Sequence, residues 1–209
     1  MIARIHFSRF VTRREEQVLV DRVLAAGALE VPADIRALMS PVGTMLGPAL
    51  SSSRLTPQSP IGTAVRSASP EFSWRPMDGA TSYSVAVFDE RFNEVAQSPR
   101  ITTTSWTPSV ALPRGVPLAW QLTAHASDRD VIAPTPPQPE ARFLVVTDAA
   151  AAALAAQETR LAAEPLALGV VFANAGLVVD AERVLSRAAA DSSPDIAGRA
   201  KALLASVKK

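Results

Sequence analysis

The middle of the chain alternates apolar and polar residues with a period of two, which is the pattern of β-strands that bury one face. The alternation is clearest in Ser82–Asp89 and in Pro117–Ala126. Prolines at the margins of such segments, where a ladder donor is dispensable, support their boundaries. Seven strands are expected, at Ile61–Arg66, Glu71–Arg75, Ser82–Asp89, Glu94–Gln97, Ile101–Trp106, Pro117–Ala126 and Ala141–Val146. So many short strands within residues 60–146 predict a seven-stranded antiparallel β-sandwich.

Helical spacing of apolar residues marks the start of the chain. Thr12 begins a capping box ahead of an apolar stripe, Gly27 is a helix stop, and Pro32 suits the first turn of a second short helix. Residues 40–59 are rich in proline, glycine and serine, which predicts a linker. We therefore expect residues 1–59 to form a helical lead-in and linker.

From residue 147 onward the apolar residues again follow helical spacing, with glycine and proline between the segments. Four helices are expected, at Asp148–Ala163, Pro165–Ala175, Val179–Ala190 and Pro194–Val207. The predicted fold is therefore mixed, with N-terminal helices, a β-sandwich over 60–146 and a C-terminal α-helical repeat-like unit over 147–209.

Composition excludes several classes of function. Twenty-one basic and twenty acidic residues leave a formal net charge of +1, which removes the broad positive field of a nucleic-acid-binding surface. The absence of cysteine excludes disulfides, thiolate zinc sites and cysteine nucleophiles. The sequence has neither a phosphate-binding glycine loop nor a Gly-x-Ser-x-Gly motif, and no apolar run approaches the roughly 20 residues that span a bilayer. We expect no cofactor, no metal, no nucleic-acid partner and no membrane insertion.

Residues of the middle segment follow the pattern of a known module. The pattern consists of Pro70-x-Phe72-x-Trp74, Gly79-Ala80-x-x-Tyr83-x-Val85, and Leu112-x-x-Gly115 before Trp120-x-Leu122-x-Ala124. It resembles fibronectin type III and related immunoglobulin-like modules. The resemblance implies that Trp74, Tyr83 and Trp120 fill the space between two sheets about 10 Å apart. It also implies that Leu112 packs beneath a turn that Gly115 permits.

The C-terminal helices resemble tetratricopeptide repeats over one unit of about 34 residues. The resemblance is carried by Leu168, Gly169, Phe172, Gly176, Ala181, Leu185, Ala188 and Pro194. It implies that Gly169 and Ala181 are small because two helices cross closely, with Phe172 and Leu185 filling the space beside them. In this family the groove-lining helix binds peptides, and the corresponding helix here is Pro165–Ala175. One repeat cannot bury its own faces, so flanking helices are expected to cap it.

Taken together, the helical lead-in, the sandwich and the repeat-like helices are similar to the extracytoplasmic parts of bacterial membrane-anchored regulators, including some anti-sigma-factor-like proteins. The resemblance implies a binding or scaffolding role in a bacterial envelope or regulatory assembly. The expected partner is a protein, and the expected location is extracytoplasmic, in the periplasm or in a membrane-anchored ectodomain.

Four residues are candidates for partner binding. Trp106 has polar neighbours, which predicts an exposed indole face on which a sugar could stack. Phe92 lies among the carboxylates of residues 89–94, where a solvated turn is expected because the Asp-x-Asp-x-Asp-Gly spacing of a calcium loop is missing. Pro136 and Pro137 belong to a stiff, proline-rich stretch. This stretch is either a rigid connection between the last two strands or a segment recognised by an aromatic groove.

His125 ends a strand beside Ser127, Asp128 and Asp130, which raises the alternative of a Ser/His/Asp hydrolase or a metal site. Neighbouring side chains of a strand point to opposite faces, so we expect turn residues here instead. The chain is therefore expected to be a non-catalytic protein-interaction or scaffolding module. The alternative is a carbohydrate-binding sandwich that recognises a glycan through Trp106 and the strand-end loops.

Overall fold

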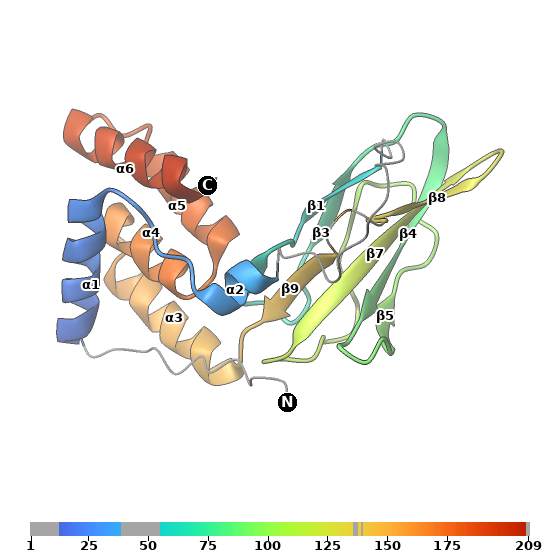
Figure 1. Cartoon of the computed structure of the whole chain (residues 1–209), viewed down its shortest axis with the longest axis horizontal. Helices are drawn as coiled ribbons and strands as arrows, with labels where there is room; N and C mark the ends of the chain where they lie inside the picture. The colour runs from blue at the N-terminus through green and yellow to red at the C-terminus, as the bar shows by residue number, and fades with distance from the viewer. Residues whose placement is uncertain (1–12, 39–54, 136–137, 139, 208–209) are drawn as a thin grey trace, which may run out of the picture. The chain divides into compact units, whose positions relative to one another are not determined.

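A computed structural model of the chain describes residues 13–38, 55–135, 138 and 140–207 (Figure 1). These residues form six helices and nine strands, so the fold combines helices and β-sheets, as the sequence predicts. Contacts divide the chain into two compact units. The helical unit is drawn from Met1–Ile35 and Val146–Lys209, and the β-unit is drawn from Arg36–Val145. The first helix thus groups with the C-terminal helices, whereas residues 1–59 were expected to form a separate lead-in and linker.

The helices lie close to the expected segments, and local signals explain their ends. They are α1 (Arg13–Ala26), α2 (Ala33–Ala37), α3 (Asp148–Arg160), α4 (Pro165–Asn174), α5 (Val178–Ala188) and α6 (Pro194–Val207). Gly27 ends α1 with a φ of 65°, and its amide donates to Val23 O at 2.9 Å. The side chain of Thr147 accepts from the amide of Ala150 at the start of α3. Thr12, which was expected to cap the first helix, lies outside the described residues.

Helices α4 and α5 pack closely in the helical unit because a glycine faces a leucine (Figure 1). A Cβ added at Gly169 would lie 2.6 Å from Leu185 Cδ2, so any larger residue would force the Leu185 side chain to move. Leu185, Phe172 and Ala181 have no exposed surface. The expected close crossing at Gly169 is therefore confirmed.

A buried ion pair joins α1 to α3. Glu16 is 5% exposed, and its carboxylate accepts from Arg160 Nη2 at 2.6 and 2.7 Å and from Gln157 Nε2 at 2.8 Å. A carboxylate is rarely buried without such partners. Glu16 and Arg160 are 144 positions apart, so the contact has no local signature in the sequence.

Two sheets form the β-unit. The small sheet has the order β1 (Thr56–Ser59), β3 (Phe72–Arg75) and β6 (Ser105–Trp106). The large sheet has the order β2 (Thr63–Val65), β9 (Ala141–Val145), β7 (Pro117–Ala126), β4 (Ala80–Phe88) and β5 (Glu94–Gln97), and β8 (Asp130–Ala133) also pairs with β7. The pairing of β2 with β9 is parallel, and the other strand pairs of the two sheets are antiparallel.

The structure corrects the expected strands in four respects. It has nine strands among the described residues, whereas seven were expected. Strand β1 lies at the end of the segment expected to be a linker, and residues 40–54 of that segment lie outside the described residues. Strand β8 lies where only a connection was expected. Strand β2 pairs with the last strand, β9, and runs in the same direction, whereas an antiparallel arrangement was expected.

The two sheets share one apolar core. The ring of Phe72 on β3 packs edge-on against Trp120 of β7 and Phe143 of β9, at centroid distances of 5.2 and 5.5 Å. Trp74, also on β3, packs against Tyr83 of β4 at 5.5 Å. The core burial expected for Trp74 and Trp120 is confirmed, since each is 2% exposed.

Replacing Gly176 by alanine is expected to destabilise the helical unit. Gly176 has a φ of 78°, and an added Cβ would lie 2.5 Å from Ile35 Cγ1. Left-handed strain of about 1–2 kcal/mol and overpacking of about 1–3 kcal/mol should together lower the free energy of unfolding by about 2 kcal/mol or more, measured by urea denaturation.

The matched control is Gly198→Ala in α6, where an added Cβ meets no atom within 4 Å. This variant should gain about 0.5–1 kcal/mol, because alanine is the better helix former. Equal effects of the two substitutions would show that the space around Gly176 does not matter.

Candidate functional site

The outer face of the large sheet carries the side chains that the core does not use. On β4, Val85 is buried whereas Ser84 and Phe88 keep exposed surface. Strands β4 and β7 lie side by side (Figure 1), and the outward positions of β7 lie opposite those of β4, with Ala119 facing Phe88 and Thr123 facing Ser84. Side chains at such facing positions lie on one face of the sheet, within contact range. This face has a hydrogen-bonded set of side chains near Ser84 and an apolar hollow near Phe88.

Ser84, His125 and Asp130 form a continuous hydrogen-bonded set. His125 Nε2 lies 3.0 Å from Ser84 Oγ, and His125 Nδ1 lies 2.9 Å from Asp130 Oδ1. A carboxylate can only accept, so Nδ1 donates to Asp130, and Nε2 of the neutral ring accepts from the Ser84 hydroxyl. His125 is 9% exposed, whereas the side chain of Asp130 is 55% exposed. Nucleophile, base and orienting carboxylate follow this same order in hydrolases that use a serine.

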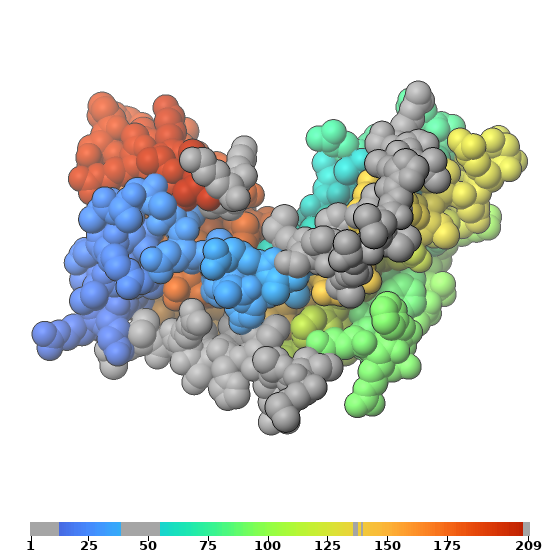
Figure 2. Space-filling view, in the orientation of Figure 1, coloured from blue at the N-terminus to red at the C-terminus, as the bar shows by residue number. Residues whose placement is uncertain are grey.

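Three neighbouring strands bring these side chains together. Strand β7 lies between β4, which supplies Ser84, and β8, in which Asp130 is directly opposite His125. The hairpin of β7 and β8, drawn in yellow, projects from the β-unit in Figure 2, and residues 127–130 at its tip are exposed. The set is therefore held by paired strands and is open to solvent on its Asp130 side.

The sequence predicts only part of this set. Ser127 and Asp128 lie in the connection between β7 and β8, as turn residues are expected to do. Ser84 was not predicted, because it lies 41 positions from His125 and their contact depends on the order of strands in the sheet. Asp130 was expected in a turn because β8 was not expected. The segment Asp130–Ala133 has one polar residue followed by three apolar ones, so no alternation in the sequence distinguishes this strand from a connection.

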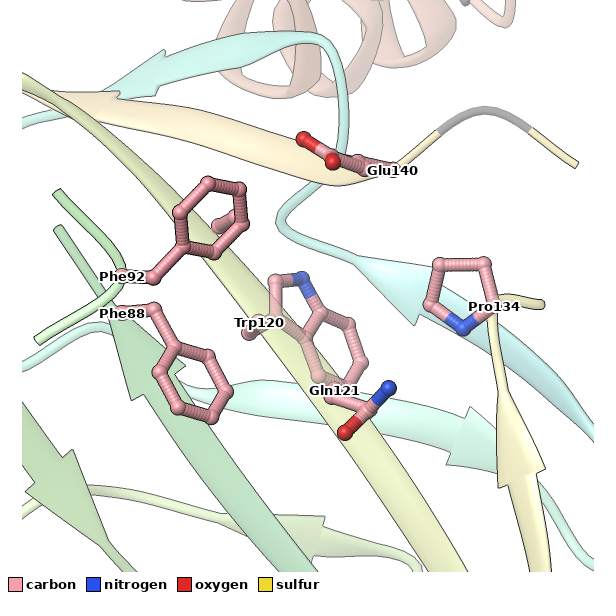
Figure 3. A pocket seen from close by; sticks show the side chains of 7 residues that line it. Phe88, Phe92, Trp120, Gln121, Pro134 and Glu140 are labelled. Atoms are coloured by element: carbon pink, nitrogen blue, oxygen red, sulfur yellow. The ribbon is translucent and has the colours of Figure 1, made fainter. Parts of the chain in front are cut away.

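An apolar hollow of about 210 Å³ opens at the other end of the face (Figure 3). The rings of Phe88 and Phe92 lie together on one side, Pro134 lies on the opposite side, and Trp120 lies between them. The full lining consists of Phe88, Phe92, Ala119, Trp120, Gln121, Pro134 and Glu140. Glu140 is the one charged member of this lining, and its Oε2 accepts from Arg142 Nε at 2.8 Å. The lining is therefore mostly apolar, and its one carboxylate is paired with an arginine.

The loop between β4 and β5 holds Phe92 beside the hollow. Phe92 has a φ of 61°, which is uncommon for a residue other than glycine, and it is 75% exposed. The carboxylate of Asp89 accepts from the amides of Arg91 and Asn93 and from the side chain of Asn93, at 2.8 to 2.9 Å. The Phe92 amide donates to Asp89 O at 3.0 Å. The loop therefore holds an exposed ring on a backbone whose conformation is fixed by several hydrogen bonds.

The remaining candidate residues lie elsewhere or outside the described part of the chain. Trp106 on β6 is partly buried, and its ring packs against Phe72 at a centroid distance of 5.5 Å. Pro136 and Pro137 lie outside the described residues. Helix α4, which the repeat resemblance assigns to a peptide groove, is buried at every position from Ala167 to Ala173.

Comparisons of the chain with family models, with curated proteins and with solved structures find no match. Within the described residues, no three His, Cys, Asp or Glu side chains lie together in a way that could hold a metal ion. None of the helices described is both long enough and apolar enough to cross a membrane.

Asp89 is expected to titrate below its ordinary range, and Asn93→Ala should raise its pKa. The hydrogen bond from the Asn93 side chain is the largest cause that lowers the pKa of Asp89, followed by the Asn93 amide. Because the folded pKa lies below the unfolded value of about 3.9, the ionised carboxylate stabilises the loop above that pH. This stabilisation is lost as the pH falls through the folded pKa.

Carboxyl-carbon NMR titration of the wild type and of Asn93→Ala measures this effect. The matched control is Arg91→Ala, which leaves both Asn93 donors in place and should change the pKa of Asp89 less. An unchanged pKa of Asp89 in Asn93→Ala would show that the hydrogen bond from the Asn93 side chain does not stabilise the ionised carboxylate.

Proposed function

We propose that this chain is a protein-interaction module and that the hollow beside Phe92 binds an apolar side chain of the partner. The observation that carries the proposal is the 75% exposure of Phe92 on a backbone that Asp89 already fixes. Burying a large apolar side chain contributes about 1.5–3 kcal/mol, and a fixed loop loses little entropy on binding. The pairing of Glu140 with Arg142 favours an apolar anchor over an ionic one.

The resemblances add a proposal about the fold and the setting. We infer that the β-unit is a fibronectin type III or immunoglobulin-like sandwich and that the helical unit is tetratricopeptide-like. The shared core around Trp74, Tyr83 and Trp120 supports the first inference, and the close crossing at Gly169 supports the second. The same resemblance supports a scaffolding role outside the cytoplasmic membrane, in a bacterial envelope or regulatory assembly.

Phe92→Asn is expected to weaken binding of a polypeptide anchor. Asparagine tolerates the left-handed backbone, so the substitution removes the ring and keeps the loop. Peptides selected from a random displayed library on the full chain should share one large apolar residue. Their affinity for Phe92→Asn, measured by calorimetry, should fall by at least about tenfold.

The matched control for this test is Val110→Ala, because Val110 is 52% exposed and does not line the hollow. Its affinity for the selected peptides should equal that of the wild type. Peptides that bind the wild type and Phe92→Asn equally well would reject the hollow as the binding site.

Carbohydrate binding through Trp106 is the second candidate function. The favouring observation is that Trp106 keeps exposed surface on β6, which is an edge strand of the small sheet. A flat aromatic face is suited to stacking on a sugar ring. Binding on a glycan array should be lost in Trp106→Ala and kept in Phe92→Asn. An array on which the wild type gives no signal, or on which Trp106→Ala binds like the wild type, would remove this candidate.

A further inference from the structure

We propose that Ser84 is an activated nucleophile that attacks carboxylic esters, with His125 as its general base and Asp130 as the orienting carboxylate. This activity is distinct from polypeptide binding at the hollow. The 3.0 Å contact of Ser84 Oγ with His125 Nε2 and the 2.9 Å contact of His125 Nδ1 with Asp130 Oδ1 carry the proposal. Both distances are within the range that nucleophile–base and base–carboxylate pairs require.

The surroundings of His125 fix the position of its ring. Its burial leaves little of the ring to bulk water, so Ser84 and Asp130 are the partners of its two nitrogens. The Thr81 hydroxyl donates to the carbonyl of His125 at 3.0 Å, which anchors the end of β7. Because the three groups stand on β4, β7 and β8, paired strands rather than a free loop fix their geometry.

The exposure of Ser84 favours a chemical role over a purely structural one. A cross-strand network that only stabilised the sheet would function with its hydroxyl sealed from solvent. Ser84 is only partly buried and lies on the outer face of the sheet, not in the core. In the proposed reaction the ester approaches the hydroxyl from this outer face.

The proposed reaction has two steps. Ser84 Oγ attacks the ester carbonyl carbon, and its proton passes to His125 Nε2. The bond between this carbon and the alcohol oxygen then breaks, the alcohol leaves with the proton from His125, and the acyl group stays on Ser84 Oγ. Water next attacks the acyl carbon with His125 as base, which releases the carboxylic acid and restores the Ser84 hydroxyl.

The backbone around Ser84 determines how fast this reaction can be. The amide of Val85 donates to Ser98 Oγ at 2.9 Å, and the amide of Tyr83 donates to Ile101 O at 2.7 Å. These amides are committed to the protein, so they do not supply the oxyanion stabilisation that fast hydrolases obtain from the residue after the nucleophile. General-base catalysis alone contributes about 10²–10⁴-fold. We therefore expect acylation by activated esters and slow release of the acyl group.

The test exposes the folded full-length chain to p-nitrophenyl acetate. We expect a burst of p-nitrophenolate, about one equivalent per chain, and peptide mass mapping should place the acetyl group on Ser84. Ser84→Ala should abolish the burst. His125→Gln should lower its rate about 10²-fold, and Asp130→Asn should lower it at least about tenfold. The matched control is Ser82→Ala, since Ser82 is the preceding serine on the same face of β4.

Two results would overturn the proposal. One is acetylation of Ser84 no faster than in the chain unfolded in urea. The other is a rate that neither His125→Gln nor Asp130→Asn changes. Circular dichroism checks the folding of each variant, and Asp130→Asn keeps the test decisive if His125→Gln unfolds, because the Asp130 side chain is 55% exposed. Peptide binding that depends on Phe92 should persist in Ser84→Ala, so failure of the esterase proposal is separable from failure of the binding proposal.

Discussion

The packing of Phe72 between Trp120 and Phe143 is the contact on which the β-unit depends, because it joins the small sheet to the large one. Aromatic pairs of this geometry contribute about 0.5–1.5 kcal/mol beyond the burial of their area. Phe72 has no exposed surface, and the strands that carry its two partners are adjacent in the large sheet. The core therefore fixes which face of β7 and β9 points inward.

Successive residues of a strand point to opposite faces, so each residue in the core has chain neighbours on the outer face of the sheet. Trp120 and Leu122 belong to the core, so Gln121 and Thr123 of β7 face outward. The apolar hollow and the hydrogen-bonded set of Ser84, His125 and Asp130 use this outer face at different points along the paired strands β4 and β7. Both sites thus obtain their geometry from the core behind them.

Sequence periodicity predicted the elements that bury one face and expose the other. Strand β7 and helix α6 were predicted with their observed bounds, because each has a clear apolar pattern and a proline at its start. Strand β1 has no large apolar residue and β8 has three apolar residues in a row, so neither shows the alternation that predicts a strand. Periodicity also carries no information on strand order. It could place Phe92 in a loop and His125 at a strand end, but not the contact of His125 with Ser84.

The most direct test of this account is the ¹⁵N NMR spectrum of the neutral His125 ring. If the core holds the outer-face groups in one arrangement, Nδ1 should have the shift of a protonated nitrogen that donates to Asp130. Nε2 should have the shift of an unprotonated nitrogen that accepts from Ser84. Two averaged shifts, equal to those of a free histidine side chain, would contradict a fixed arrangement and with it the link between the core and the outer face.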